Sequence, residues 1–155
     1  MEGKTVLIST VTGLVGIFYL LYAGIMLYNW IIETVIPDVG SINYVLGLFV
    51  PGDPGSVIAL VTISMLMLGS LYYKLNDTKG LSCLLLGSLI GVAMLILQLL
   101  IVIANIASIG VSTLSGEILE YNAFEDLLRP EIVLGIISLT LFTYSVFKIR
   151  EITSK

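Results

Sequence analysis

The sequence predicts an all-α integral membrane protein in which four transmembrane helices form an antiparallel bundle, with residues 1–155 as a single domain. Three observations support this fold class. Apolar residues make up 57% of the chain and charged residues only 12%, about half the share that is usual in soluble domains. The charges are clustered and leave four long uncharged stretches. Crossing about 30 Å of hydrocarbon takes roughly 20 helical residues, and the first three stretches are long enough.

The first expected span covers residues 5–32, which carry no charge. Its helix is expected to run on to Ile36, because the first helix breaker after the span is Pro37. The following loop, residues 33–53, contains the apolar segment 41–50, which is too short to cross a bilayer. We expect this segment to be interfacial or re-entrant, or to pack as a plug against neighbouring helices.

The second and third expected spans cover residues 54–73 and 80–106. Asp53-Pro54 predicts the start of the second helix, because an N-cap aspartate followed by proline at the first helical position is a favourable beginning. Only a tight turn, residues 75–79, separates these two spans. They are therefore expected to form an antiparallel pair.

The fourth expected span covers residues 130–148. Pro130 and Glu131 are expected to begin it at the level of the lipid headgroups, with the carboxylate on the positive end of the helix dipole. The loop before it, residues 107–129, is expected to hold a short amphipathic helix on the outer side, because apolar residues recur there at helical spacing. These residues are Ile118, Tyr121, Phe124 and Leu128.

Lysine and arginine are divided unequally between the two sides of the expected bundle. Six of the seven lie on the side of the termini: Lys4, Lys74, Lys79, Lys148, Arg150 and Lys155. The opposite side holds Arg129 and the acidic residues Glu33, Asp38, Asp53, Glu117, Glu120, Glu125, Asp126 and Glu131. The positive-inside rule predicts cytoplasmic N- and C-termini and acidic loops outside, in the plasma membrane, with the first span as an uncleaved anchor.

The composition also excludes several kinds of chemistry. The chain has no histidine and one cysteine, Cys83, so it cannot assemble a Ser-His-Asp or Cys-His nucleophile, a CxxC pair or a Cys-rich metal site. We therefore predict no enzyme activity, no catalytic or cofactor-binding residues and no bound metal. The formal net charge of −4 argues against nucleic-acid binding through a basic patch.

Small and polar residues form one stripe along the third span, here called the packing seam. Its members are Gly80, Cys83, Gly87, Gly91, Gln98 and Asn105. At 100° per residue they fall within an arc of about 80°. Gly87 and Gly91 form a small-xxx-small motif that lets two helix backbones approach closely, and Gln98 can hydrogen-bond across a helix pair. We expect the seam to pack inside the bundle; contact with a separate subunit and a polar pore lining are the alternatives.

Four carboxylates in the second loop form a second candidate surface, here called the acidic face: Glu117, Glu120, Glu125 and Asp126. Carboxylate oxygens can bind a hard cation such as Ca²⁺, but the spacing of an EF-hand is absent. The acidic face is therefore expected to be hydrated, and it is a candidate docking surface for a partner.

The function predicted from these features rests on what the spans lack. Transporters and proton relays carry ionisable residues inside the membrane, and none of the four predicted spans has one in its central portion. We therefore predict a noncatalytic accessory subunit of a larger respiratory, hydrogenase or transport assembly. Its partners would be the lipid bilayer and other membrane subunits or copies of itself. The alternatives are a homo-oligomeric channel or small-solute carrier without proton coupling and, third, a membrane enzyme using the carboxylates of the outer loops.

Overall fold

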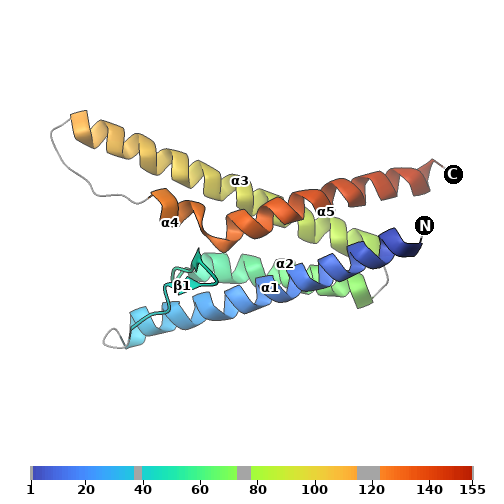
Figure 1. Ribbon diagram of the computed structural model, residues 1–155, viewed down its shortest axis with the longest axis horizontal. Helices are drawn as coiled ribbons and strands as arrows, with labels where there is room; N and C mark the ends of the chain where they lie inside the picture. The colour runs from blue at the N-terminus through green and yellow to red at the C-terminus, as the bar shows by residue number, and fades with distance from the viewer. Residues whose placement is uncertain (1, 37–39, 73–77, 115–122, 155) are drawn as a thin grey trace.

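The structure, a computed structural model, describes residues 2–36, 40–72, 78–114 and 123–154 (Figure 1). Within these residues, four helices are long and apolar enough to cross a membrane. The helices are α1 (Glu2–Val35), α2 (Pro54–Tyr72), α3 (Thr78–Leu114), the short α4 (Ala123–Leu127) and α5 (Pro130–Thr153), and the strands are β1 (Tyr44–Val45) and β2 (Leu48–Phe49). The predicted fold class is confirmed, including a short helix between the third and fourth spans.

The long helices pack in sequence order, α1 on α2, α2 on α3 and α3 on α5, whereas α1 and α5 make fewer contacts with each other. Both chain termini lie at one end of the bundle, here called the terminal end (Figure 1). The two strands and α4 lie at the other, here called the hairpin end. Successive long helices run in opposite directions, so every pair with close packing is antiparallel.

Two helix starts follow from the local sequence. Asp53 caps α2 as predicted, because its Oδ1 accepts the Gly55 N–H at 2.9 Å and its Oδ2 accepts the Ser56 hydroxyl at 2.7 Å. Helix α5 begins at Pro130, also as predicted, but the preceding residue Arg129 makes no side-chain capping bond. Helix α1 ends at Val35, one residue before the expected limit.

Helix α3 is longer than predicted. The sequence predicts a loop over about residues 107–129, but α3 continues as a helix to Leu114, so the prediction of a loop is wrong for residues 107–114. The uncharged run contains no proline there, and the predicted limit came from bilayer thickness rather than from a helix-stopping residue. At 1.5 Å per residue, the 37 residues of α3 span about 56 Å, whereas the 19 residues of α2 span about 28 Å. Helix α3 accordingly extends well past α4 (Figure 1).

The interior of the bundle mixes apolar and polar side chains. The core cluster consists of Val15, Tyr19, Tyr22, Ala23, Met26, Val50, Val57, Leu60, Ile63, Met67, Leu84, Leu134 and Leu141. Polar residues are buried beside it: Thr12, Asn29, Ser56, Ser64, Ser70, Ser88, Gln98, Asp126, Glu131, Ser138 and Ser145. Large apolar residues such as Ile58, Met65 and Leu100 face outward, as expected of a surface that contacts lipid.

The segment 41–50 forms a small antiparallel hairpin, with Tyr44 paired to Phe49 and Val45 to Leu48. Its two turn residues have positive φ values, 52° at Leu46 and 80° at Gly47, as a two-residue type I′ turn requires. Of the alternatives for this segment, the structure supports the plug, because Val45, Leu48 and Val50 pack against the core. A two-residue turn ending in glycine between two apolar pairs was the available signal for a hairpin.

Candidate functional site

The packing seam of α3 lies mostly inside the bundle. Gly80, Gly87, Gly91 and Gln98 are buried, and Cys83 and Asn105 are partly buried. A Cβ atom on Gly87 would lie 3.0 Å from Leu66 Cβ and 3.5 Å from the Met67 nitrogen, so α2 crosses α3 closely there. Gly16 on α1 serves in the same way, since a Cβ there would lie 3.2 Å from the Leu68 and Met67 side chains of α2.

Gly91 lies where three helices meet. A Cβ atom at this position would lie 2.6 Å from Ser138 Oγ on α5 and 3.1 Å from the Tyr19 hydroxyl on α1. These two hydroxyl groups are hydrogen-bonded to each other at 3.0 Å, and both side chains are buried. The absence of a side chain at Gly91 therefore makes room for a polar contact that joins α1 to α5.

Glu131 is more deeply buried than its sequence position indicates. The sequence places it at the level of the lipid headgroups and gives no sign that protein would cover it, but the residue is only 1% exposed. Neither carboxylate oxygen has a hydrogen-bond partner among the described residues. The Ser56 and Asp53 side chains and the Arg129 guanidinium are near enough to interact with it electrostatically. The packing of α3 against α5, with Asp53 and Ser56 from the start of α2 nearby, covers a side chain that the helix start alone would leave at the surface.

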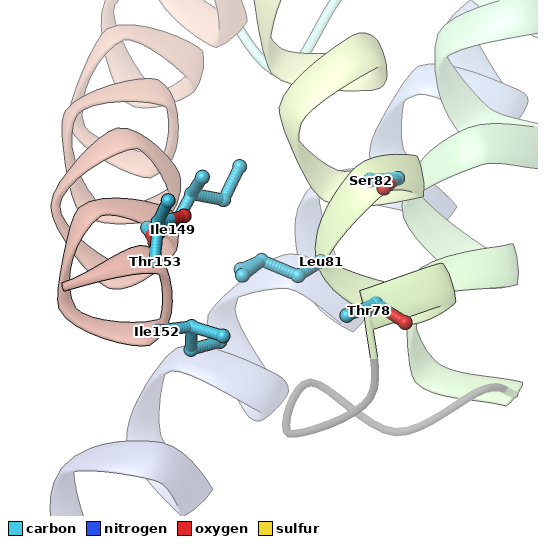
Figure 2. Close-up of a pocket in the computed structure, with 6 residues that line it drawn as sticks. All are labelled: Thr78, Leu81, Ser82, Ile149, Ile152 and Thr153. Carbon is cyan, nitrogen blue, oxygen red and sulfur yellow. Dashed lines mark hydrogen bonds between the residues drawn. The ribbon is translucent and has the colours of Figure 1, made fainter. Parts of the chain in front are cut away.

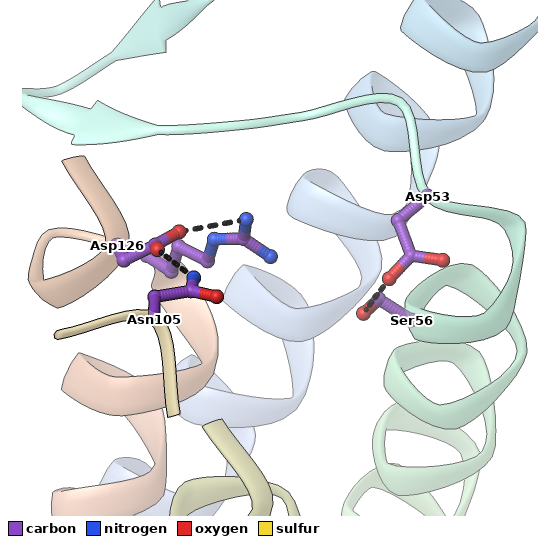
Figure 3. Close-up of polar contacts among 5 residues, drawn as sticks. Asp53, Ser56, Asn105 and Asp126 are labelled. Carbon is purple, nitrogen blue, oxygen red and sulfur yellow. Dashed lines mark hydrogen bonds and ion pairs between the residues drawn. The ribbon is translucent and has the colours of Figure 1, made fainter. Parts of the chain in front are cut away.

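Asp126 is placed differently from its prediction. The side chain is 10% exposed, and its Oδ1 pairs with Arg129 Nη2 at 2.8 Å. Its Oδ2 accepts a hydrogen bond from Asn105 Nδ2 at 3.0 Å (Figure 3). The expectation of a hydrated group is wrong here, because α4 packs against α3 at Asn105. Phe124, which was expected on the apolar face of this helix, is instead 75% exposed.

The rest of the acidic face is described only in part. Glu117 and Glu120, together with the apolar residues Ile118 and Tyr121, lie outside the described residues. Glu125 is partly buried beside the hairpin. Partial desolvation, followed by the hydrogen bond and charge of the Glu125 carboxylate, raises the pKa of Tyr44 above its usual range.

Asn29 is a structural residue that the sequence analysis missed. Its Nδ2 donates to the carbonyl oxygens of Ile42 at 2.9 Å and Val50 at 2.7 Å, and its Oδ1 accepts the Ile42 N–H at 2.9 Å. The hairpin is held on its other side by the Phe49 N–H, which donates to the Leu128 carbonyl at 3.0 Å. A buried asparagine within an otherwise apolar span was the signal that could have identified it.

The terminal end holds a small recess between the start of α3 and the end of α5 (Figure 2). It is lined by Thr78, Leu81, Ser82, Ile149, Ile152 and Thr153 and has a volume of about 160 Å³. Binding pockets for drug-sized ligands are typically about 300–1,000 Å³, so this recess is small. Its lining holds hydroxyl and aliphatic groups and no titratable side chain. In the described part of the chain, no group of three or more His, Cys, Asp or Glu side chains could hold a metal ion.

A model of the family described as the MJ0565 integral membrane domain matches residues 2–149. The chain belongs to this family. Membership agrees with the four apolar helices, and the protein is therefore an integral membrane protein that contacts the lipid bilayer. Neither the comparison with curated proteins nor the comparison with solved structures gives a match. The family description states no substrate or partner.

Proposed function

We propose that this member of the MJ0565 family is a noncatalytic accessory subunit of a larger membrane protein complex, such as a respiratory, hydrogenase or transport assembly. The observation that carries the proposal is the exposed end of α3. Ile106 is 52% exposed and Leu114 is 90% exposed. Both lie beyond Asn105, the residue through which α3 contacts α4.

The length of α3 supports a position outside the hydrocarbon for this end. Even at a tilt of 40°, near the upper limit for transmembrane helices, a helix of about 56 Å rises about 43 Å, and the hydrocarbon is about 30 Å thick. Lys79, in the first turn of α3, favours an interfacial position for the opposite end of the helix. Lipid tails would then leave the last turns of α3 uncovered, and exposed apolar surface of this kind is typical of contacts between proteins.

The last turns of α3 also present small residues that the bundle does not use. Ala104, Ala107 and Ser108 are exposed and share one face of the helix. Ala104 and Ser108 have small-xxx-small spacing, which lets another helix approach closely. Gly87 and Gly91 of the packing seam already contact α2 and α5, so they offer no surface to a partner. We therefore propose that a helix of another subunit packs on this face of α3.

Co-purification in mild detergent tests the proposal. Replacing Ala107 and Ser108 by leucine is expected to lower the ratio of co-purified subunit to this chain about tenfold, which corresponds to about 1.4 kcal/mol. Ala93→Leu is the matched control, because Ala93 is an exposed alanine on the same helix that faces lipid within the span. An unchanged ratio in the double variant would contradict docking on this face. A pure homo-oligomer that conducts ions in liposomes would instead support the channel.

We propose further that the terminal end faces the cytoplasm and that the protein resides in the plasma membrane. Lys79, Lys148 and Arg150 lie at the terminal end, whereas Arg129 at the hairpin end is paired with Asp126. A cysteine introduced at Gly40 tests this orientation. Its side chain should be accessible to a labelling reagent, because a Cβ atom there would meet no atom within 4 Å. In a Cys83→Ser background, an impermeant maleimide should label Gly40→Cys on intact cells and Thr153→Cys only after permeabilisation. The reverse pattern would invert the topology.

A further inference from the structure

Glu131 and Gln98 are two buried polar side chains with atoms left without hydrogen-bond partners in the described part of the chain. The atoms without a hydrogen-bond partner are both carboxylate oxygens of Glu131 and the Nε2 of Gln98. Such groups are uncommon in folded proteins, since burial removes the water that would satisfy them. An ionisable residue enclosed within a membrane bundle is a candidate functional site by default. The sequence analysis missed Glu131 because it lies at the start of a helix rather than at its centre.

The packing of α3 on α5 brings these two side chains to the same level. A Cβ on Gly91 would contact Ser138, and a Cβ on Gly135 would lie 2.7 Å from Leu95 Cβ. These contacts fix the register of the antiparallel pair, so that the next turn places Gln98 level with Glu131. Ser56 on α2 reaches the same level, because it interacts with the Glu131 carboxylate.

Enclosure by protein is the largest influence on the Glu131 carboxylate, and together with the Asp53 charge it disfavours a negative charge. The Ser56 hydroxyl, a backbone N–H and Arg129 favour the negative charge but do not outweigh the enclosure. From α2, the Asp53 carboxylate is a second negative charge, and its two oxygens already accept the Gly55 N–H and the Ser56 hydroxyl. From α1, the nearby titratable group is the Tyr19 hydroxyl, which is bonded to Ser138. Among the described residues, the cationic side chain near Glu131 is Arg129, which is paired with Asp126 at 2.8 Å. At the same level, α3 contributes the neutral Gln98.

We propose that Glu131 is a proton-binding site in the interior of the bundle, held as a neutral carboxylic acid at neutral pH. Addition of one proton to one carboxylate oxygen removes the buried charge and leaves the other oxygen as a carbonyl acceptor. Gln98 Nε2 is not hydrogen-bonded to Glu131 in the structure, but it is an unpartnered donor at the same level that a side-chain rotation could bring to that acceptor. The new O–H can donate to the hydroxyl oxygen of Ser56. A proton suits this site better than a metal ion, because the described residues offer no cluster of several carboxylates around it.

Infrared spectroscopy of the purified full-length protein in liposomes tests the proposal directly. The folded wild-type protein should show the C=O stretching band of a protonated carboxyl group at neutral pH, with a small shift in D₂O. Glu131→Gln should lose this band, and Asp126→Asn should retain it, because Asp126 is ionised beside Arg129. Absence of the band in the wild-type protein, or its persistence in Glu131→Gln, would overturn the proposal. Loss of the band on adding NaCl, but not choline chloride, would mean that Na⁺ occupies the site instead.

A pH titration provides a measurement that does not depend on whether the variant folds. The folded state binds one more proton than the unfolded state near neutral pH, so wild-type stability should fall as the pH rises. The wild-type acid band should persist while stability falls and should disappear at the high-pH end of that range, where Glu131 of the folded protein loses its proton. If Glu131→Gln folds, its melting temperature should not show this fall, whereas Glu125→Gln should show it fully. A wild-type acid band and melting temperature that stay constant into the alkaline range would contradict proton exchange at Glu131.

Discussion

Where buried polar side chains do form hydrogen bonds, the terminal half and the hairpin half of the bundle use different partners. In the terminal half, Ser70, Ser88 and Ser145 donate to carbonyl oxygens three or four residues earlier in their own helices. In the hairpin half, Asn29 bonds to residues 13 and 21 positions away, and Asn105 bonds to Asp126, 21 positions away. The first arrangement needs only a helix, whereas the second needs a particular packing of several segments.

This difference indicates which part of the molecule carries specific structure. Helix–helix contacts in the terminal half and the middle rely on small residues that let backbones approach, since lipid tails are as apolar as leucine and give no net gain on burial. The hairpin half adds a short hairpin, an ion pair and a buried carboxylic acid site. Variants at the small residues of the helix contacts should therefore lower the stability of the whole bundle. Variants in the hairpin half should have smaller and more local effects.

The largest loss is expected at the seam. Gly91→Leu places a side chain where even a Cβ would lie 2.6 Å from Ser138 Oγ, so α3 and α5 must move apart. We expect a loss of about 3 kcal/mol, at the upper end for overpacking, measured as the melting temperature in detergent. Leu89→Ala is the control, because Leu89 is exposed to lipid on the same helix. Equal melting of Gly91→Leu and the wild-type protein would mean that the seam does not pack in this way.

A smaller and more local loss is expected for Asn29→Leu. The change removes three hydrogen bonds and leaves the buried Val50 carbonyl without its donor. Hairpin opening should become easier by about 2 kcal/mol, so that hydrogen exchange at the Ile42 amide accelerates roughly 30-fold. Protection in the middle of α2 should change little. Asn43→Leu, which alters an exposed asparagine in the same loop, should leave exchange nearly unaltered, and equal effects of both variants would contradict the role of Asn29.

The smallest of the three effects is expected at the ion pair. Asp126→Asn removes the charge that pairs with Arg129, whose side chain is 19% exposed, and keeps a side chain of the same shape. We expect a loss of about 1–2 kcal/mol, because one charged hydrogen bond is weakened and water can partly replace it. Glu125→Gln, in the preceding position, should cost less. If both variants lose the same stability, the hairpin half does not depend on this pair.

The elements that the sequence predicts well are those with local signals. The Asp53-Pro54 cap defines the start of α2, and Pro130 defines the start of α5. The end of α3 could not be placed, because residues 107–114 contain neither a charge nor a proline, and bilayer thickness is a poor guide for a helix that projects beyond it. The prediction for the acidic face is wrong at Asp126. Its position close to other carboxylates in the sequence suggested hydration, whereas its hydrogen-bond partner Asn105 lies on another helix.

By itself, the amino-acid sequence determines that this chain has four apolar membrane helices, where two of them begin, and that its seam glycines can admit another helix closely. Only the tertiary structure decides that Asn29 holds a hairpin, that Asp126 is paired and that Glu131 is enclosed. The physical reason is that hydropathy measures transfer from water, and the protein interior and lipid are almost equally apolar. Which polar side chain becomes buried depends instead on the register and crossing of helices whose contacting residues lie far apart in sequence, as Tyr19 and Ser138 do.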